Sequence, residues 1–248
     1  MSRATVLEEI HDGVLVLTLN RPKQRNAFND QQYDDVRGAL AAAQATDRIR
    51  VAVITGAAGA FSAGQDISEM GSGRAFTPFV DQLASFDKPL IAAVNGVAVG
   101  IGVTMLPHCD LVYLAASARL RAPFAALGLV CEAGSSLLLP LVMGPQRAAD
   151  VLLSARWVTA SEAVDLGLAA CAVPDHELLP TALAKAREIA AQPLVVLRQL
   201  KALLRATYVD ALVAARARED ALQADRLGSP ENLAAIRAFQ KKRTPPKK

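Results

Sequence analysis

The sequence predicts an α/β fold that ends in a helical region. Two observations support this prediction. Over roughly the first 175 residues, short runs of Val, Ile and Leu alternate with segments in which apolar residues recur three and four positions apart. After Pro174 only the second pattern remains. Strands that alternate with helices are typical of an α/β core, and the change of pattern places helices alone at the C-terminal end.

The strand predictions follow from β-branched and aliphatic runs that stop at Gly, Pro or Asn. The run 13–20, GVLVLTLN, ends at Arg-Pro, and VAVITG at 51–56 is closed by glycine. A third run, 88–96, begins with Lys-Pro, and proline is tolerated at the first position of a strand. DLVYLAA at 110–116 and LAACAV at 168–173 are the remaining predicted strands.

The helix predictions rest on helical spacing together with capping residues. Asn29 or Asp30 is expected to cap a helix that continues to about residue 46, and 75–86 is a second predicted helix. Ser229 precedes Pro230, a pair typical of a helix start, and this last helix is expected to end near Lys242. The other predicted helices are 135–144, 182–191, 194–206 and 209–227.

The overall charge of +3 comes from the last eight residues, KKRTPPKK. These hold five of the 27 basic groups, which leaves 22 against 24 acidic ones and a net charge of −2 for the rest. A slightly acidic body argues against a nucleic-acid partner. Three well-separated cysteines show no metal-ligand spacing and suit a reducing compartment, so we expect a cytoplasmic protein without a metal site.

The segment Pro89–Pro107 is apolar and about as long as a membrane-spanning helix. It also contains Asn95, Thr104 and three glycines, with a proline at each end. This composition favours a buried strand, a glycine turn and a short helix over a membrane span.

Two bends rich in small residues are candidate binding sites. One is GAAGAFSAGQDISEM at 56–70, and the other is VNGVAVGIGVTM at 94–105. Small residues allow a backbone to approach a ligand closely, and free N–H groups at such bends can bind an oxyanion. The glycine spacing of the second bend does not match the dinucleotide-binding fingerprint. The alternative for the first bend is a tight turn with Asp66 as a helix cap, but both bends follow strands and are expected to converge.

Glu132 is the single charged residue between Arg121 and Arg147. A carboxylate among apolar residues is costly unless it is compensated. It could be an acid that faces the N-terminus of the helix at 135–144, where negative charge is favoured. It could equally be a general base whose pKa is raised by apolar neighbours. The three histidines have no acid or nucleophile patterned around them, so a catalytic triad is not expected.

Together these stretches resemble the crotonase, or enoyl-CoA hydratase/isomerase, superfamily. The resemblance is carried, in order, by NRPKQRNAFN, FSAGQDI, AAVNGVAVGIG, LGLVCEAGSSLLLPLVMG, ASEAVDLGLAACAVP and AFQKKR, and it covers nearly the whole chain. It implies a spiral of ββα units over 1–190 and a C-terminal helical trimerisation region over 191–248. It further implies acyl-CoA substrates, no cofactor beyond the CoA moiety, and a homotrimer or a dimer of trimers.

The resemblance also assigns site residues. The backbone amides of Ala63 and Ile101 would form an oxyanion hole, in which each preorganised donor contributes about 10²–10³-fold in rate. Lys23, Arg25, Phe239 and Lys242 would lie against the CoA moiety. The implied contacts of the acyl-CoA also include Ala60, Phe61, Gln65, Asp66, Ile67, Gly100, Thr104 and Phe124.

Departures from the family pattern point to one reaction. Where hydratases of this type carry two glutamates, the sequence has Thr104 and Phe124, neither of which can act as a base. GLVCEAGSS resembles instead the pattern of the family's Δ3,Δ2-enoyl-CoA isomerases, a glutamate followed by glycine and two small hydroxyl residues. The resemblance therefore implies an isomerase in which Glu132 transfers the proton. The alternatives are an enoyl-CoA hydratase and, from another class, a binding protein that uses the basic tail for RNA.

Overall fold

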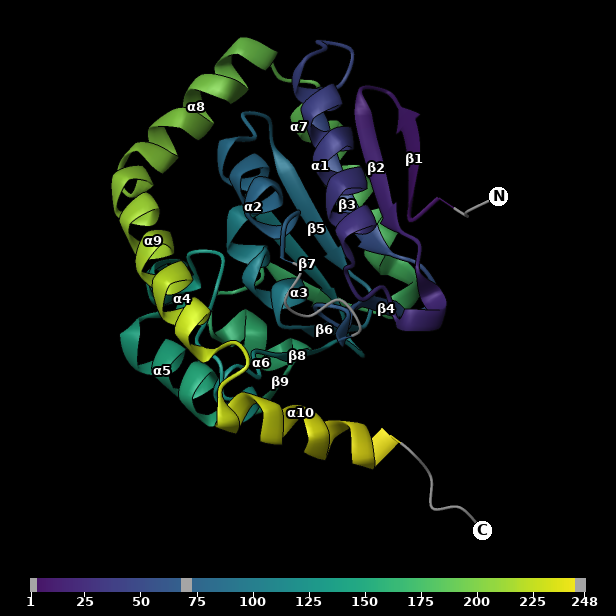
Figure 1. The fold of residues 1–248 in the computed structure, drawn as a ribbon. Helices are drawn as coiled ribbons and strands as arrows, with labels where there is room; N and C mark the ends of the chain where they lie inside the picture. Colours follow the sequence, from purple (N-terminus) through teal and green to yellow (C-terminus); the bar gives the residue numbers. More distant parts are fainter. Residues whose placement is uncertain (1–3, 68–72, 244–248) are drawn as a thin grey trace.

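The computed structural model describes residues 4–67 and 73–243, and for 239–243 it describes the backbone alone. Its larger sheet has six strands (Figure 1). All neighbours are parallel except the first pair, which is antiparallel. In spatial order the strands are β1 (Val6–His11), β2 (Val14–Leu19), β3 (Val51–Gly56), β5 (Leu90–Val94), β7 (Leu111–Ala115) and β10 (Cys171–Val173).

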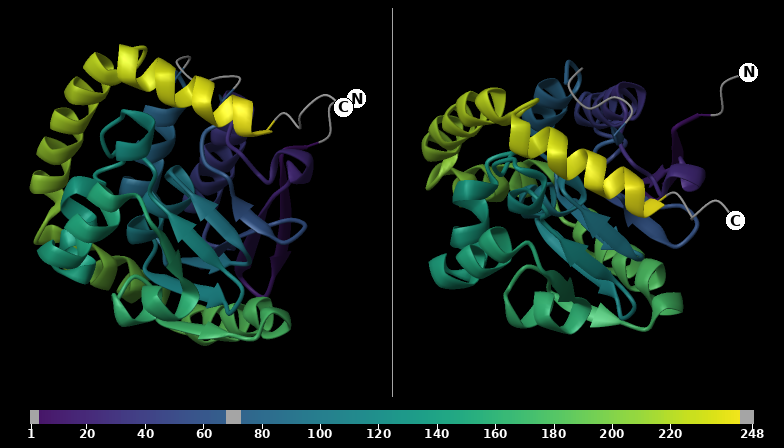
Figure 2. Two further views of the ribbon diagram at one scale, coloured as in Figure 1. Left: turned by 90° about the horizontal axis from the view of Figure 1, so that it is seen from below. Right: turned by 60° about the horizontal axis from the view of Figure 1, so that its bottom comes forward.

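The central strands β3 and β5 are buried at every position. Their sequences, VAVITG and LIAAV, are apolar on both faces rather than alternating, with Thr55 as the polar exception, because helices cover both faces of a parallel sheet. Helices α1 (Asp30–Gln44) and α2 (Phe76–Ser85) pack on each other, and α7 (Leu178–Ala190) packs against β3 and β5 from the opposite face (Figure 2).

A second, smaller sheet is formed from four strands of three residues each: β4 (Ala60–Ser62), β6 (Val97–Val99), β8 (Arg119–Arg121) and β9 (Trp157–Thr159). Strands β4, β6 and β8 begin a few residues after β3, β5 and β7 end. The chain therefore alternates between the two sheets three times, which is the predicted crotonase-like spiral.

The remaining helices lie around the smaller sheet or on the outside of the molecule. Helices α8, α9 and α10 form an arc along the outer surface (Figure 1). The bounds are α3 (Ile101–Thr104), α4 (Ser135–Met143), α5 (Pro145–Ser154), α6 (Ala160–Asp165), α8 (Leu194–Ala206), α9 (Val209–Arg226) and α10 (Pro230–Arg243). Short 3-10 helices are η1 (Pro22–Gln24), η3 (Leu106–His108), η4 (Ala125–Leu127) and η5 (Asp175–Glu177).

Apart from a helix expected to begin near Asp66, the strands and helices predicted from the sequence are confirmed, with shifts of a few residues at the ends. The side chain of Asn29 caps α1 by accepting a hydrogen bond from the Gln32 amide, and Ser229 does the same for Asn232 at α10. Five strands were not predicted: β1, β4, β6, β8 and β9. The helix expected to begin near Asp66 would fall mainly on residues 68–72, which lie outside the described residues, so this expectation stays a prediction.

None of the helices in the described ranges is long and apolar enough to cross a membrane. The segment Pro89–Pro107 contains β5, β6 and α3, as its composition indicated. The boundary proposed at residue 190 falls between α7 and α8, and the division into two units there stays a prediction.

Candidate functional site

The two small-residue bends lie against each other, as predicted. Strands β4 and β6 pair in parallel and bring the bends together at their carboxyl ends. A Cβ atom on Gly64 would lie 2.9 Å from the Val99 carbonyl oxygen, and one on Gly102 would lie 3.0 Å from the Ser62 carbonyl oxygen. The first distance is too short for a real Cβ and the second is unusually tight, so glycine at these positions permits the close approach of the two bends.

The amides of the first bend are not all available to a ligand. The Ala63 amide donates to the Arg25 carbonyl oxygen at 2.9 Å, so its assignment to an oxyanion hole is wrong. Its neighbours at Gly64 and Asp66 also donate within the protein. The Gln65 amide, within the described part of the chain, has no acceptor.

In the second bend the predicted donor is free. The Gly100 amide bonds to the Arg121 carbonyl oxygen at 3.0 Å, and Gly100 has a φ of +54°. The Ile101 amide is at the first position of α3, where a helix provides no acceptor, and no other described residue accepts from it. The two touching bends therefore offer one unpaired amide each, from Gln65 and Ile101.

The first bend is held by residues that sequence analysis did not single out. The Arg21 guanidinium forms an ion pair with Asp66 at 2.9 Å and also donates to the Ala27 carbonyl oxygen. The Asn26 side chain donates to the Ala60 carbonyl oxygen at 2.7 Å, and the Tyr33 hydroxyl donates to the Gln65 side chain at 2.7 Å. The signal was present in NRPKQRN, whose polar residues precede a helix cap, but spacing alone does not reveal these long-range contacts.

Glu132 lies in the loop that precedes α4. Its backbone carbonyl accepts from the Ser135 amide at 3.1 Å and from the Ser135 hydroxyl at 2.6 Å. The residue as a whole is half-buried, and its carboxylate takes part in no hydrogen bond or ion pair with any described residue. The amides at the N-terminus of α4 are occupied by another acid, Glu219, so Glu132 is not the helix-facing acid that the sequence allowed.

The environment raises the pKa of Glu132 to about 8. Burial is the largest cause, because it disfavours the charged form, and the negative charges of Glu219 and Asp220 add to it. A carboxyl group with such a pKa is both an effective base and an effective acid near neutral pH.

Two observations relate the Glu132 loop to the surroundings of the bends. Burial raises the pKa of Tyr33 well above its usual value, and the charge of Glu132 raises it further, so the two side chains interact electrostatically. The Tyr33 hydroxyl is itself bonded to Gln65 in the first bend. On the other side, the buried His108 ring bonds to the Ala133 carbonyl oxygen at 2.7 Å, which ties the loop to the chain that follows α3.

The other predicted site residues are distributed unevenly around this centre. Lys23 and Arg25 are exposed, and Ile67 is half-buried. The side chains of Phe61 and Thr104 are completely buried, so the structure does not offer the direct substrate contacts expected of them. Ala60 and Phe124 are also buried. Phe239 and Lys242 lie in α10, but their side chains are outside the described residues.

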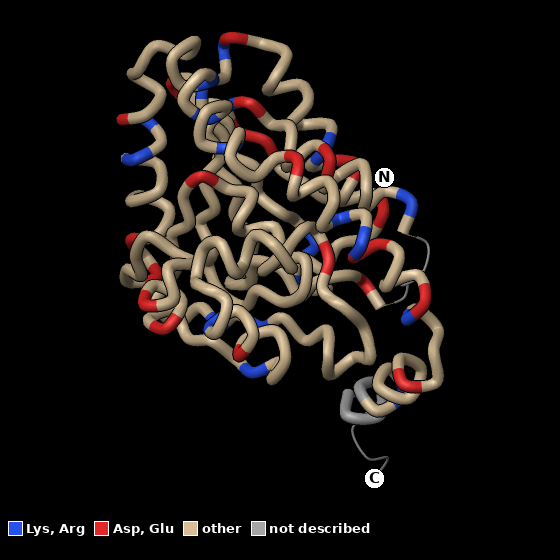
Figure 3. The backbone as a smooth tube through the Cα atoms, turned by 90° about the vertical axis from the view of Figure 1, so that its left-hand side faces the viewer, with Lys and Arg blue, Asp and Glu red and all other residues tan. Residues whose placement is uncertain are grey.

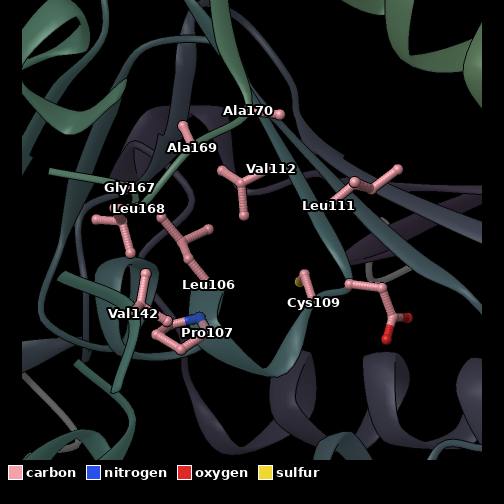
Figure 4. A pocket seen from close by; sticks show the side chains of 11 residues that line it. Leu106, Pro107, Cys109, Leu111, Val112, Val142, Gly167, Leu168, Ala169 and Ala170 are labelled. Carbon is pink, nitrogen blue, oxygen red and sulfur yellow. The ribbon is translucent and has the colours of Figure 1, made fainter. Parts of the chain in front are cut away.

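A separate cavity of about 260 Å³ lies between η3, β7 and the turn after α6 (Figure 4). Its lining is mostly apolar and includes Leu106, Val112, Val142 and Leu168. Neither Glu132 nor the two bends contribute to it. Within the described ranges, no group of three or more His, Cys, Asp or Glu side chains could hold a metal ion.

The fold and the touching bends agree with the comparisons to known proteins. A family model described as enoyl-CoA hydratase/isomerase matches residues 9–248. The structure is similar to the crystal structure of an enoyl-CoA hydratase/isomerase from Pseudoalteromonas atlantica T6c, with a TM-score of 0.93, 35% identity and coverage of 98% of this chain and 100% of that one. The chain therefore belongs to the enoyl-CoA hydratase/isomerase family, whose enzymes act on acyl-CoA.

Relatives with different activities are similarly distant. The chain is 34% identical to the 1,2-epoxyphenylacetyl-CoA isomerase of Escherichia coli (strain K12), with 97% of each protein covered. It is 36% identical to the 2,3-dehydroadipyl-CoA hydratase of the same organism, with 94% of each covered. It is 34% identical to the enoyl-CoA delta isomerase 2 of Homo sapiens over 87% of this chain and 58% of that protein. Identity alone does not select a reaction.

Proposed function

We propose that the protein is a Δ3,Δ2-enoyl-CoA isomerase in which Glu132 transfers the proton. The observation that carries the proposal is the carboxyl group of Glu132: no described residue pairs with it, and its pKa is raised to about 8. A structural acid in this position would be expected to have hydrogen-bond donors, because buried charges without partners are destabilising. An acid that must exchange a proton with a substrate needs its oxygens free.

The proposed reaction moves one proton over two carbons. Glu132 removes a proton from C2 of a 3-enoyl-CoA, and the electrons of that C–H bond delocalise through the thioester to give a dienolate. The amides of Gln65 and Ile101 donate hydrogen bonds to the dienolate oxygen, in place of the Ala63 amide that the sequence suggested. Glu132 then returns the proton to C4, the C2–C3 double bond forms, and the thioester carbonyl is restored.

The alternative is an enoyl-CoA hydratase, an activity named in one of the relatives. Hydration needs groups that orient and activate a water. At the two positions where the family's hydratases are expected to carry glutamates, this chain has a buried threonine, Thr104, and a buried phenylalanine, Phe124. The threonine hydroxyl contacts the Gly100 carbonyl oxygen at 3.4 Å within its own helix. These features favour isomerisation.

We place the CoA moiety along the exposed basic side chains near the first bend. Lys23 and Arg25 lie in the segment whose backbone supports the bend, and both are exposed. Elsewhere, acidic and basic residues are interspersed (Figure 3), which does not resemble the continuous basic face of a nucleic-acid-binding protein. Phe239 and Lys242 stay in the proposal as CoA contacts by resemblance alone.

We also propose that the chain assembles as a homotrimer or a dimer of trimers through its outer helices. Eight large apolar side chains are exposed among the described residues of α8 and α9. Isolated exposed apolar residues are common on protein surfaces, but so many on two successive helices indicate an interface. They are Val195, Val196, Leu200, Leu203, Leu204, Val209, Val213 and Leu222. Sedimentation equilibrium of the purified protein tests this assembly.

The decisive experiment replaces the proton carrier. Glu132→Gln should lower the rate of conversion of 3-hexenoyl-CoA by about 10³-fold, since general acid–base groups contribute about 10²–10⁴-fold. CoA binding, measured by calorimetry, should survive in the variant. The matched control is Glu231→Gln, an exposed acid in the first turn of α10.

Two results would contradict the proposal. Wild-type turnover retained by Glu132→Gln would remove this residue from the reaction. Rapid hydration of crotonyl-CoA by the wild-type protein, with slow isomerisation of 3-hexenoyl-CoA, would favour the hydratase alternative instead.

A further inference from the structure

Helix α9 reaches into the loop that carries Glu132. The Glu219 side chain is buried, with 4% of its surface exposed. Its carboxylate accepts hydrogen bonds from the Gly134 amide at 2.6 Å and from the Ser136 amide at 2.7 Å. These are strong, charge-assisted contacts, and they lie two and four residues after Glu132.

The same helix makes a second contact with this loop. One turn after Glu219, the Gln223 side chain accepts a hydrogen bond from the Val130 amide at 3.1 Å. From the other side, His108 bonds to the Ala133 carbonyl oxygen. Ala133 has a φ of +60°, a conformation that is unfavourable for a residue with a Cβ and persists only where its surroundings impose it. The loop is therefore clamped on both sides of Glu132.

The contacts of Glu219 also explain why Glu132 is unpaired. Free amides at the N-terminus of α4 would stabilise a nearby carboxylate and lower its pKa. Glu219 occupies two of those amides, so they are not available to Glu132. In addition, Glu219 places a negative charge near the Glu132 carboxyl group, which disfavours ionisation of Glu132.

Other charged or titratable groups surround the loop and do not provide the missing partner. They are Tyr33 on α1, Cys131 in the loop, His108 in η3, and Arg216 and Asp220 on α9. Burial lowers the pKa of His108 to about 4, so this ring is neutral near pH 7. Arg216 is paired with Asp81 at 2.7 Å, and Asp220 adds a further negative charge.

We propose that Glu219 is a positioning residue for Glu132: from the C-terminal helix α9 it holds the loop, occupies the helix N-terminus and keeps a second negative charge beside the proton carrier. The proposal rests on the function proposed above for Glu132. Glu219 lies outside the sequence motifs that carry the family resemblance. Its proposed role is to make the Glu132 carboxylate more basic.

The test measures the pKa of Glu132 directly, without turnover. In protein labelled with ¹³C-glutamate, the carboxyl signal of Glu132 is identified by its loss in Glu132→Gln and is followed from pH 4 to pH 10. In Glu219→Gln the titration midpoint of Glu132 should fall by about one pH unit. The substitution removes a like charge and puts the N–H donors of a glutamine side chain next to the loop. An unchanged midpoint in a folded variant would overturn the proposal.

Two matched variants separate charge from attachment. Gln223→Ala removes an uncharged contact with the same loop, and it should leave the midpoint of Glu132 nearly unchanged. Asp220→Asn removes a neighbouring charge that does not bond to the loop, and its shift should be smaller than that of Glu219→Gln. A shift in Gln223→Ala as large as that in Glu219→Gln would overturn the proposal, because loosening of the loop would then be sufficient.

A measurement on the wild-type protein covers the case in which Glu219→Gln does not fold. Two interacting carboxyl groups respond to each other's titration. The carboxyl ¹³C signal of Glu219 should therefore show a step at the midpoint of Glu132. A Glu219 signal that remains flat through that midpoint would show that the two charges do not interact.

Steady-state kinetics complete the test and distinguish the two proposals. For isomerisation, Glu219→Gln should move the acidic limb of the kcat/KM profile to lower pH and reduce kcat about tenfold with KM little changed, because a weaker base remains in a nearly intact site. Glu219→Asp, which retains the charge, should restore the limb. If the midpoint moves but the wild type has no isomerase activity, the function proposed for Glu132 fails and the electrostatic role of Glu219 stands.

Discussion

Two regions of the molecule withdraw charged side chains from solvent, and a comparison of Lys88 in one with Glu132 in the other shows opposite arrangements. Under α8, the side chain of Lys88 is completely buried, yet its ammonium group donates to the carbonyl oxygens of Ala43, Thr46 and Ile49, each at 2.6 Å. In the loop before α4, Glu132 is half-buried and has no partner among the described residues.

Lys201 belongs to the first region. This lysine on α8 donates to the Lys88 carbonyl oxygen and to Asp110, both at 2.6 Å. Burial lowers its pKa to about 8, the value to which burial raises the pKa of Glu132. Lys201 and Glu132 thus have the same pKa in different surroundings. The buried lysines have hydrogen-bond acceptors, and the glutamate has no hydrogen-bond partner among the described residues. A satisfied buried charge indicates a structural role, and an unsatisfied one indicates chemistry.

Replacement of Lys88 should have the largest effect on stability. Lys88→Met removes the donor from three carbonyl groups between the end of α1 and the start of β3, two of them buried, so we expect the free energy of unfolding to fall by about 4 kcal/mol. Urea denaturation measures this loss. Activity toward acyl-CoA per folded molecule should not change.

The control for Lys88→Met is Lys185→Met, which removes a half-buried lysine from a surface ion pair with Glu188 and should change the free energy of unfolding by less than about 1 kcal/mol. A loss for Lys88→Met no greater than for this control would show that its three contacts contribute little, and the contrast between the two regions would disappear.

Replacement of Glu132 should act in the opposite direction on stability. Because its folded-state pKa of about 8 exceeds the ordinary 4.5, the folded protein binds this proton more tightly than the unfolded chain does. Wild-type stability from this group is therefore complete below pH 4.5 and is lost as pH rises through 8. Glu132→Gln cannot titrate, so it should equal the wild type at pH 4 and exceed it at pH 9. The shift from 4.5 to about 8 would correspond to about 5 kcal/mol, and we expect about 3 kcal/mol because the half-buried side chain is partly screened by solvent.

Thermal or urea unfolding of both proteins across this pH range gives the comparison. The Glu231→Gln variant should follow the wild type at every pH. A stability difference for Glu132→Gln that does not grow with pH would mean that the carboxylate is compensated in a way that the structure does not show.

The smallest effect is expected for Lys201. Lys201→Met should cost about 2 kcal/mol near pH 7, since Asp110 is partly exposed and its lost ion pair is screened. The direction in which stability changes with pH follows from the difference between the pKa of Lys201 in the folded and unfolded states. A lysine whose folded-state pKa is lowered to about 8 contributes stability that is present above pH 10.5 and is lost as pH falls through 8.

The stability gap between the wild type and Lys201→Met should therefore widen between pH 8 and pH 10, opposite to the trend for Glu132. Urea titrations at pH 7, 8.5 and 10 are sufficient to detect it. A gap that narrows over this range would contradict the lowered pKa.

Much of this fold could be predicted from the sequence because its central strands are continuously apolar and its helices carry recognisable caps. Strand β3 and helix α1 are clear examples. The three-residue strands of the smaller sheet could not be predicted, since β4 and β6 lie in glycine- and alanine-rich bends whose composition indicates a turn. Such short strands exist because neighbouring strands pair with them, and a local pattern does not contain that information.

In the candidate site, too, some features could be predicted from local sequence and others depend on contacts between distant residues. Glu132 was identifiable because it is an isolated charge in an apolar segment, and the bends were identifiable by their small residues. The sequence could not show whether Ala63 or Gln65 provides the free amide. That depends on the Arg25 carbonyl oxygen, which lies 38 positions before Ala63 and accepts from its amide. The contact of Glu219 with the α4 amides spans more than 80 residues, and α9 appears in the sequence as an ordinary helix with a polar face.

The support of the Glu132 loop by α9 has a consequence for synthesis of the protein. A chain that leaves the ribosome acquires the bends and Glu132 early, but Glu219 and Gln223 emerge about 90 residues later. Until α9 has been made and has docked, the loop therefore lacks the hydrogen bonds that Glu219 and Gln223 provide in the folded protein. If Glu219 tunes Glu132 as proposed, the full basicity of this acid also depends on that late docking step.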